Sequence, residues 1–198
     1  MFAYLITKDN FFSQKVLKNA TLKIQQFNAK YNQNIILKYA CLRYINGKDS
    51  IKNDIDSIES FCNICTEFNI TPLFNLSENI LEISQLLSQK TINVGIHLKD
   101  SMLDIIDNQN IVNLKPKFYS AHSLDSITLA LSKNIDYVTI SPIYYDKYNK
   151  ALGVNYLANL DSNLKSKLIA LGGINTESKI IEIKKLNLAG FASISYFL

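Results

Sequence analysis

The chain contains two histidines, and each lies within or just after a short apolar run. Histidine suits proton transfer near neutral pH because its unperturbed pKa is about 6.5. His122 lies just beyond one such run, where it can act as a general base or cap the helix that starts near Ser123. His97 lies inside an apolar run, which favours a packing role over catalysis. We therefore take His122 as the candidate catalytic residue.

Glycine and serine residues near the C-terminus form a candidate phosphate site. Gly172 and Gly173 close one apolar run and open a loop, and glycine allows backbone amides to approach a bound anion. Ser193 and Ser195, with Ile194 between them, end the last apolar run and supply further hydroxyl and amide donors. The glycine pair is also typical of a tight strand-to-helix turn without a ligand, so both interpretations stay open.

Short apolar runs alternate with amphipathic segments along the chain. The eight strand-like runs cover residues 2–7, 35–44, 71–75, 93–98, 117–120, 137–141, 167–171 and 190–195. Helical patterns cover residues 11–30, 51–68, 80–87, 124–133, 156–164 and 178–186, with a weak turn near 103–107. About 25 residues per strand–helix unit allow parallel strands joined by crossover helices. The pattern predicts an α/β fold, namely a single (β/α)8 TIM barrel domain over residues 1–198 that lacks a full final helix, with a doubly wound sheet as the alternative.

In a parallel barrel the carboxyl ends of the strands carry the active site. The polar residues and glycines predicted at those ends are therefore the candidate site. The first four strands contribute Lys8, Asp9, Arg43, Asn75, His97, Lys99 and Asp100. The last four contribute Ser120, His122, Ser141, Tyr144, Lys147, Lys150, Gly172, Gly173, Ser193 and Ser195.

The composition excludes several classes of protein. The chain has 21 Lys and Arg against 17 Asp and Glu, a net charge of +4 and 47% hydrophobic residues, which is typical of a globular protein. The lysines form no basic run, so we expect no nucleic-acid partner. No run approaches the roughly 18 apolar residues of a membrane helix, and residues 1–7 resemble a strand more than a signal peptide. We expect a cytoplasmic protein without a membrane partner.

Cys62 and Cys65 form a C-x-x-C pattern, which raises the question of a redox or metal site. Together with Ile58 and Phe68, the two cysteines lie at the three- and four-residue spacing of one helix face, which places them in an apolar stripe that faces the core. A redox pair is expected at a helix N-terminus, where the helix dipole lowers a thiol pKa. We therefore predict that these cysteines serve packing.

Six segments, most of them in the second half of the chain, carry a family resemblance. They are Gly95-Ile-His-Leu98, Tyr119-Ser-Ala-His-Ser123, Asp136-Tyr-Val138, Ser141-Pro-Ile-Tyr144 with Lys150 and Gly153 beyond it, Ala170-Leu-Gly-Gly-Ile-Asn175 and Gly190-Phe-Ala-Ser-Ile-Ser195. In order and spacing they resemble the signatures of the thiamine phosphate synthase and thiazole tautomerase (TenI-like) superfamily. The resemblance implies a TIM barrel that acts in thiamine biosynthesis on a small molecule, a thiazole phosphate. It also implies that His122 matches the proton-transfer histidine of the tautomerases and that the substrate and its phosphate are bound by Arg43, Asn75, Ser120, Lys150, Gly153, Gly172, Gly173, Ile194 and Ser195.

The first half of the chain departs from the family pattern. A Gln-x-Arg-x-Lys motif that binds the pyrimidine diphosphate in the synthase is reduced to Arg43, with Lys48 as a candidate substitute. Leu76 and Met102 occupy the two positions of the magnesium-binding carboxylates, which leaves Asp100 as the nearest acid. Because Mg²⁺ prefers carboxylate and phosphate oxygens, we expect no cofactor, and Mg²⁺ only if the synthase reaction is retained.

Three functions are consistent with these observations. The first is thiazole tautomerase-like proton transfer by His122, without a metal. The second is a thiamine phosphate synthase, a transferase that joins a pyrimidine diphosphate to the thiazole phosphate. The third is a non-catalytic relative that keeps the phosphate pocket. We rank them in this order, and the sequence leaves a homo-oligomer open.

Overall fold

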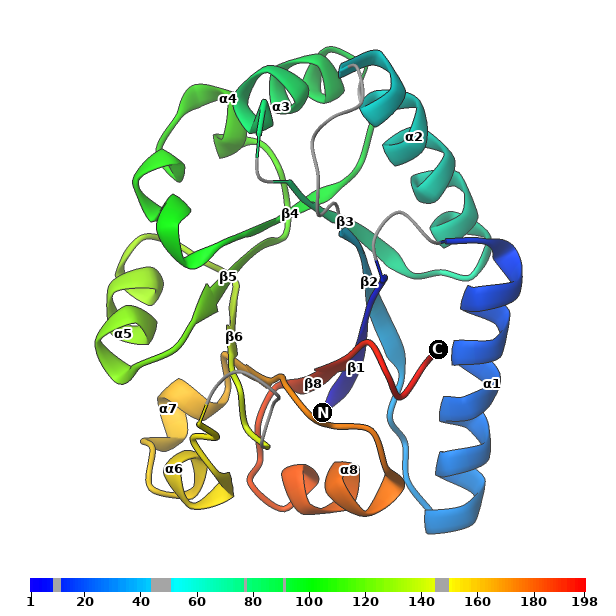
Figure 1. Ribbon diagram of the computed structural model, residues 1–198, viewed down its shortest axis with the longest axis vertical. Helices are drawn as coiled ribbons and strands as arrows, with labels where there is room; N and C mark the ends of the chain where they lie inside the picture. The colour runs from blue at the N-terminus through cyan, green and yellow to red at the C-terminus, as the bar shows by residue number, and fades with distance from the viewer. Residues whose placement is uncertain (9–11, 44–50, 77, 91, 145–149) are drawn as a thin grey trace.

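The computed structural model describes residues 1–8, 12–43, 51–76, 78–90, 92–144 and 150–198. Its eight parallel strands are β1 (Phe2–Ile6), β2 (Leu37–Arg43), β3 (Thr71–Asn75), β4 (Gly95–Leu98), β5 (Lys117–Ala121), β6 (Tyr137–Ile140), β7 (Leu168–Ala170) and β8 (Gly190–Ser193). Each strand pairs with the next along the chain, and β8 pairs with β1 (Figure 1). This closure confirms the predicted (β/α)8 barrel over the doubly wound sheet, whose edges would stay open.

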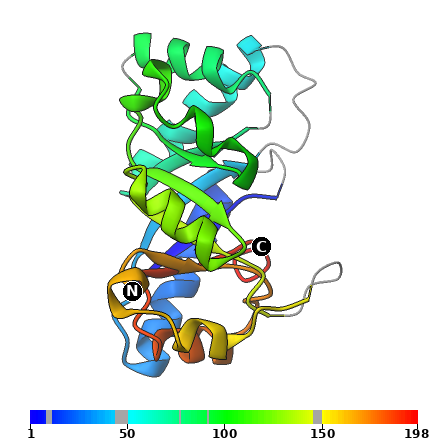
Figure 2. The ribbon, with the colours of Figure 1, turned by 90° about the vertical axis from the view of Figure 1, so that its left-hand side faces the viewer.

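Helices on the outside of the barrel connect the strands (Figure 1). They are α1 (Gln14–Tyr31), α2 (Ile51–Glu67), α3 (Ile80–Gln89), the 3-10 helix η1 (Asp100–Ile105), α4 (Gln109–Val112), α5 (Leu124–Ser132), α6 (Val154–Ala158), α7 (Ser162–Lys165) and α8 (Glu177–Lys184). Residues 194–197 form a bend and turns after β8. Figure 2 shows the two termini at opposite ends of the barrel. In the part of the chain that the structure describes, no helix is long and apolar enough to cross a membrane.

Side-chain caps set where several helices begin. Ser123 forms a capping box with Ser126 at the start of α5. The single helix predicted over residues 156–164 is wrong, because this segment contains the end of α6 and the start of α7. Asp161 accepts a hydrogen bond from the Asn163 N–H at 2.7 Å and so begins α7 as a separate helix.

Successive strand residues point to opposite sides of the barrel wall. On β1, Ala3 and Leu5 pack outward against the helices, whereas Tyr4 packs inward. Inside the barrel the Tyr4 ring makes an edge contact with Phe118, with 5.1 Å between the ring centroids. These side chains fill the interior, so a ligand site is expected at the barrel mouth.

The C-x-x-C pair packs in the core, as predicted. Cys62 and Cys65 are buried residues of α2. Burial raises the pKa of the Cys62 thiol to about 12 and also raises that of Cys65. Cys41 lies inside the barrel, where burial raises its pKa to about 12. Neutral, buried thiols are poor nucleophiles and metal ligands, which argues against the redox and metal interpretations.

Candidate functional site

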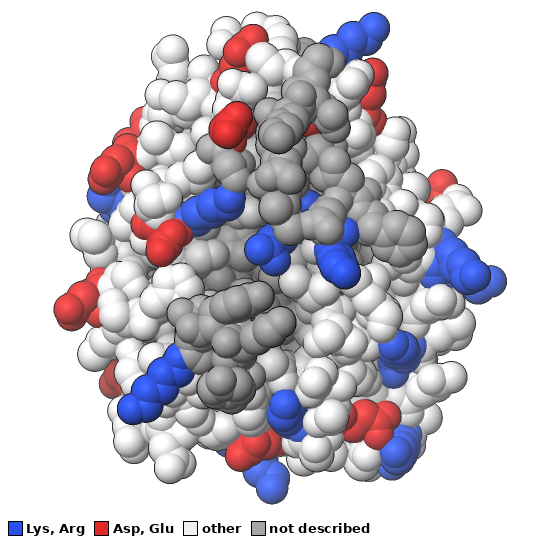
Figure 3. Space-filling view, viewed as in Figure 1, with Lys and Arg blue, Asp and Glu red and all other residues white. Residues whose placement is uncertain are grey.

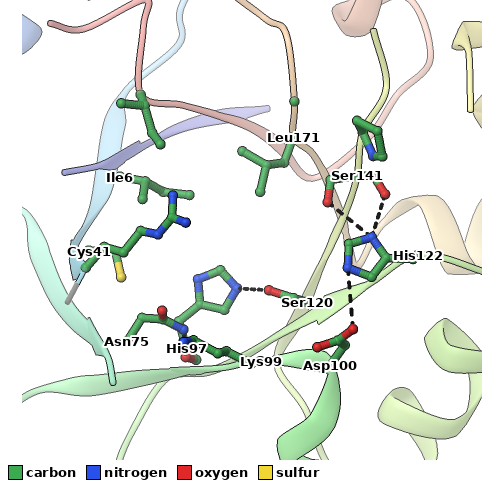
Figure 4. A pocket seen from close by; sticks show the side chains of 14 residues that line it. Ile6, Cys41, Asn75, His97, Lys99, Asp100, Ser120, His122, Ser141 and Leu171 are labelled. Atoms are coloured by element: carbon green, nitrogen blue, oxygen red, sulfur yellow. Dashed lines mark hydrogen bonds and ion pairs between the residues drawn. The ribbon is translucent and has the colours of Figure 1, made fainter. Parts of the chain in front are cut away.

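A pocket of about 410 Å³ lies at the carboxyl ends of the strands (Figure 4). The predicted site residues that line it are Arg43, Asn75, Ser120, His122, Gly172 and Ile194. Further side chains predicted at this face also line it, namely His97, Lys99, Asp100 and Ser141. The barrel thus brings residues that are far apart in the sequence together at one end.

The remaining predicted site residues that the structure describes do not line this pocket, and they are Lys8, Tyr144, Lys150, Gly153, Gly173, Ser193 and Ser195. Asp9 and Lys147 lie outside the described residues. Lys150 and Ser195 are exposed in the loops after β6 and β8. Gly153 directly precedes α6. Lys48 lies outside the described residues. The binding roles of all these residues stay predictions.

His122 lies on the rim of the pocket, with 54% of its side chain exposed. Its Nδ1 donates a hydrogen bond to the Ser141 carbonyl oxygen at 2.8 Å, since a carbonyl can only accept. Its Nε2 lies 3.7 Å from Asp100 Oδ2 (Figure 4). Nε2 is therefore the atom that can take up and return a proton. The helix-capping alternative does not hold, because Ser123 caps α5.

His97 contributes to the floor of the pocket and is 4% exposed. Its Nδ1 lies 2.9 Å from Tyr4 Oη, and its Nε2 lies 3.1 Å from Ser120 Oγ and 3.3 Å from Thr139 Oγ1. Burial, and to a smaller extent the charge of Arg43, lowers the pKa of His97 to about 3. His97 is therefore a neutral, hydrogen-bonded residue near neutral pH.

The buried neutral state of His97 predicts stability that is sensitive to acid. The unfolded chain protonates this imidazole near pH 6.5, whereas the folded protein does so only near its lowered pKa of about 3. The unfolded state therefore binds more protons between these values, and stability falls as the pH falls from about 6.5 towards 3. We expect His97 to lower the free energy of unfolding by on the order of 1 kcal/mol for each pH unit of acidification in that window.

Urea unfolding at about pH 7 and about pH 5 measures this loss in the free energy of unfolding. A His97→Gln variant keeps a polar side chain but has no group that titrates there, so it should lose less stability between the two conditions. An equal loss in both proteins would contradict the assignment.

Part of the pocket is basic. Arg43 and Lys99 line it, and Figure 3 shows Lys and Arg side chains near the centre of the face viewed in Figure 1. Burial lowers the pKa of His97 and raises that of Cys41, and the Arg43 charge adds to the first change and opposes the second. All three residues line the pocket. Asn75 Nδ2 donates a hydrogen bond to the His97 carbonyl oxygen, which fixes the Asn75 side chain. These cations favour an anionic ligand.

The loop after β7 packs closely against the loop after β6. Gly172 has a φ of +96°, and a Cβ at this position would lie 2.8 Å from Pro142 Cα. The Tyr144 N–H donates to the Gly172 carbonyl oxygen at 3.1 Å. The backbone therefore requires glycine here, which supports the tight-turn interpretation.

The loops after β7 and β8 each present a backbone donor. The N–H groups of Gly173 and Ser195 donate no hydrogen bond to another described residue. Lys179 Nζ donates to the Gly173 carbonyl oxygen at 2.7 Å and holds the loop against α8. Ser193 Oγ donates to the Ile174 carbonyl oxygen at 2.6 Å and holds it against β8. N–H groups that no described residue accepts favour an anion, so the tight turn is compatible with a phosphate site.

The described residues do not bring together the side chains of a metal site made by the protein alone. They contain no cluster of three or more His, Cys, Asp or Glu side chains that could hold a metal ion. Leu76 is buried in the core outside the barrel, and Met102 packs against that core. Asp100, the acid predicted as the nearest metal ligand, faces His122 instead. The expected absence of a cofactor stays a prediction.

Comparison with known proteins identifies the family. A family model described as thiamine monophosphate synthase matches residues 87–197. The chain belongs to the thiamine monophosphate synthase family. The matched part of this family member contains β4 to β8, and with them Ser120, His122 and Gly172 of the pocket.

Individual relatives agree with this assignment. The chain is 31% identical over 110 residues to an Aquifex aeolicus protein proposed to be a thiamine-phosphate synthase, and 27% identical over 121 residues to the thiamine-phosphate synthase of Methanococcus maripaludis. These matches cover 52% and 58% of this chain and 57% and 55% of the relatives, so the chain spans somewhat more than half of their length. A solved structure of thiamine phosphate pyrophosphorylase from Pyrococcus furiosus has a TM-score of 0.67 and 15% identity, over 98% of this chain and 85% of that one. At that identity the likeness shows the fold alone.

Sequence reasoning missed two features of the site in this family member. It treated Asp100 as a metal candidate and did not pair it with His122, although β4 and β5 are consecutive strands and their ends are neighbours. It also missed the contact between Tyr4 and His97, which joins residues 93 positions apart. No local pattern signals that contact, because it depends on how the barrel closes.

Proposed function

We propose that this member of the thiamine monophosphate synthase family is an enzyme of thiamine biosynthesis whose pocket binds a thiazole phosphate. The main support for the proposal is that the segment matching the family also forms most of the pocket. Residues 87–197 supply most of the pocket lining, including Ser120, His122 and Gly172.

In this proposal the phosphate group binds between the loops after β7 and β8. The N–H groups of Gly173 and Ser195 are available there as donors. Arg43 and Lys99 supply positive charge to the adjoining pocket. The thiazole ring then lies over the pocket floor, next to Ser120.

The comparisons favour thiamine-phosphate synthase activity over the tautomerase activity that the sequence analysis ranks first. In the synthase reaction the thiazole phosphate is joined to a pyrimidine diphosphate, and pyrophosphate leaves. Arg43 and Asn75 lie in the part of the pocket outside the family match and are placed to bind this second substrate. The described residues contain no group of three or more His, Cys, Asp or Glu side chains, so no metal-assisted step is assigned to them.

Proton transfer on the thiazole phosphate is the second candidate, and the geometry of His122 supports it. With Nδ1 bonded to the Ser141 carbonyl oxygen, Nε2 removes a proton from one atom of the thiazole and returns it to another. Asp100 stabilises the imidazolium between the two transfers. Neither step requires a metal.

A pair of assays tests the proposal and separates the two reactions. The protein is incubated with thiazole phosphate and the pyrimidine diphosphate, and separately with the thiazole phosphate tautomer in deuterated water. Formation of thiamine phosphate identifies the synthase, and deuterium incorporation identifies the tautomerase. We expect deuterium incorporation to persist in EDTA, since neither proton transfer requires a metal ion.

Two outcomes would contradict this account. A folded protein that makes neither product is not the proposed enzyme. Turnover that EDTA abolishes and Mg²⁺ restores would show a metal site that the described residues do not reveal.

A further inference from the structure

A chain of hydrogen bonds runs from the interior of the barrel to the pocket. Tyr4 Oη lies 2.9 Å from His97 Nδ1. On the other side of the ring, His97 Nε2 lies 3.1 Å from Ser120 Oγ (Figure 4). Tyr4 and His97 are buried, whereas Ser120 is partly exposed and lines the pocket. The chain therefore ends where a ligand binds.

The partners of His97 determine which ring nitrogen carries the proton. Burial keeps the ring neutral, with a pKa of about 3, so one nitrogen donates and the other accepts. In the first arrangement Tyr4 donates to Nδ1, and the Nε2–H group donates to Ser120 Oγ. In the second, the Nδ1–H group donates to Tyr4, whose own proton then needs another acceptor.

The first arrangement satisfies the buried groups better. In the second, the hydroxyl of Tyr4 is left with the Cys41 thiol beside it, and sulfur is a weaker acceptor than an imidazole nitrogen. Thr139 Oγ1 lies 3.3 Å from Nε2 and donates its own proton to the Tyr119 carbonyl oxygen. The Thr139 oxygen can therefore accept a hydrogen bond from an Nε2–H group. It cannot donate one to an unprotonated Nε2, because its only proton is already donated to Tyr119. Because poorly satisfied buried groups are costly, the Nε2–H form is favoured.

We propose that Tyr4 and His97 are positioning residues that make the Ser120 hydroxyl a hydrogen-bond donor towards the ligand. Ser120 Oγ accepts a bond from the Nε2–H group of His97, and no described residue accepts the Ser120 proton in this arrangement. That proton points into the pocket. The ligand atom beside Ser120 is then an acceptor, such as a phosphate oxygen or a ring nitrogen, and a ligand that presents a donor there is disfavoured. This inference deepens the proposed function and rests on it for the identity of the ligand.

The tautomer of His97 can be measured without a ligand. Long-range ¹H–¹⁵N spectra of labelled protein distinguish a ring protonated on Nε2 from one protonated on Nδ1. We expect the neutral Nε2–H form throughout the range from about pH 5 to about pH 8. The Nδ1–H form, or titration of His97 near its usual pKa of about 6.5, would overturn the proposal whatever the activity of the protein.

A double-mutant cycle tests whether the effect reaches Ser120. Ser120→Ala removes the donor, and Tyr4→Phe releases His97 to adopt the other tautomer. We expect each variant to raise the Kd for thiazole phosphate about tenfold, and the double variant to raise it no further than Ser120→Ala alone. Additive effects of the two substitutions would overturn the proposal.

A matched control is Tyr39→Phe, because Tyr39 belongs to the same aromatic cluster inside the barrel and its ring lies 6.4 Å from that of Tyr4. Its Kd for thiazole phosphate should equal that of the wild type. An increase as large as that of Tyr4→Phe would show general damage to the barrel and overturn the specific role of Tyr4. If thiazole phosphate does not bind the wild-type protein, the proposed function fails, and the tautomer measurement still decides the roles of Tyr4 and His97.

Discussion

Replacing His122 by asparagine is expected to slow proton transfer on the thiazole phosphate by about 10²–10⁴-fold. Asparagine can still donate a hydrogen bond towards the Ser141 carbonyl oxygen, which His122 Nδ1 reaches at 2.8 Å. It has no group that takes up and returns a proton near neutral pH. Because the proposed phosphate site lies at the loops after β7 and β8, the affinity for thiazole phosphate should change little. Steady-state kinetics should therefore show the loss in kcat and not in KM.

Asp100→Asn is the matched control for His122→Asn. The Asp100 carboxylate lies 3.7 Å from His122 Nε2, and both side chains are more than half exposed, so solvent screens the pair. We expect the rate to fall only about two- to fivefold. Wild-type turnover in His122→Asn would show that this histidine is not the base, and would leave the synthase reaction or a binding role.

Gly172→Ala is expected to produce the second large effect, on stability and on binding together. The added Cβ would lie 2.8 Å from Pro142 Cα, in a backbone conformation with a φ of +96° that L-residues rarely adopt. Displacing the loop after β6 costs about 1–3 kcal/mol, and the backbone strain costs about 1–3 kcal/mol more. We expect the free energy of unfolding to fall by about 2–6 kcal/mol. The affinity for thiazole phosphate should fall at least about tenfold as the loop moves.

Gly153→Ala separates the close approach from the backbone strain. Gly153 also has a positive φ, of +83°, but a Cβ there would meet no atom within 4 Å. The free energy of unfolding of this variant should therefore fall only by the cost of backbone strain, about 1–3 kcal/mol. Urea unfolding of both variants makes the comparison. Equal losses would show that contact with the loop after β6 does not explain the glycine at position 172.

The barrel could be predicted from the sequence because its strands are short apolar runs at regular intervals. The third strand agrees at both ends, over Thr71–Asn75, and the first differs by one residue. The segment 156–164 was misjudged because its apolar residues keep a helical spacing across the break between α6 and α7. The cap at Asp161 ends that continuity, and a cap inside an apolar pattern is easily overlooked.

The site could be predicted only as far as strand order decides it. Residues that end a parallel strand, such as Arg43 and Asn75, share one end of the barrel whatever the loops do. Strand order does not determine where loop residues lie, and Lys150 and Ser195 are exposed outside the pocket. The contact of Tyr4 with His97 depends on the register of four strands, which no local pattern specifies.

The central claim is that the pocket at the barrel mouth binds a thiazole phosphate, and a crystal structure of the protein with that compound tests it most directly. We predict that the phosphate lies between the loops after β7 and β8, within hydrogen-bond distance of the Gly173 and Ser195 N–H groups. The thiazole ring should lie beside Ser120 and about 3 Å from His122 Nε2, directly or through one water. A phosphate bound elsewhere, or a pocket that stays empty at saturating ligand, would contradict the account.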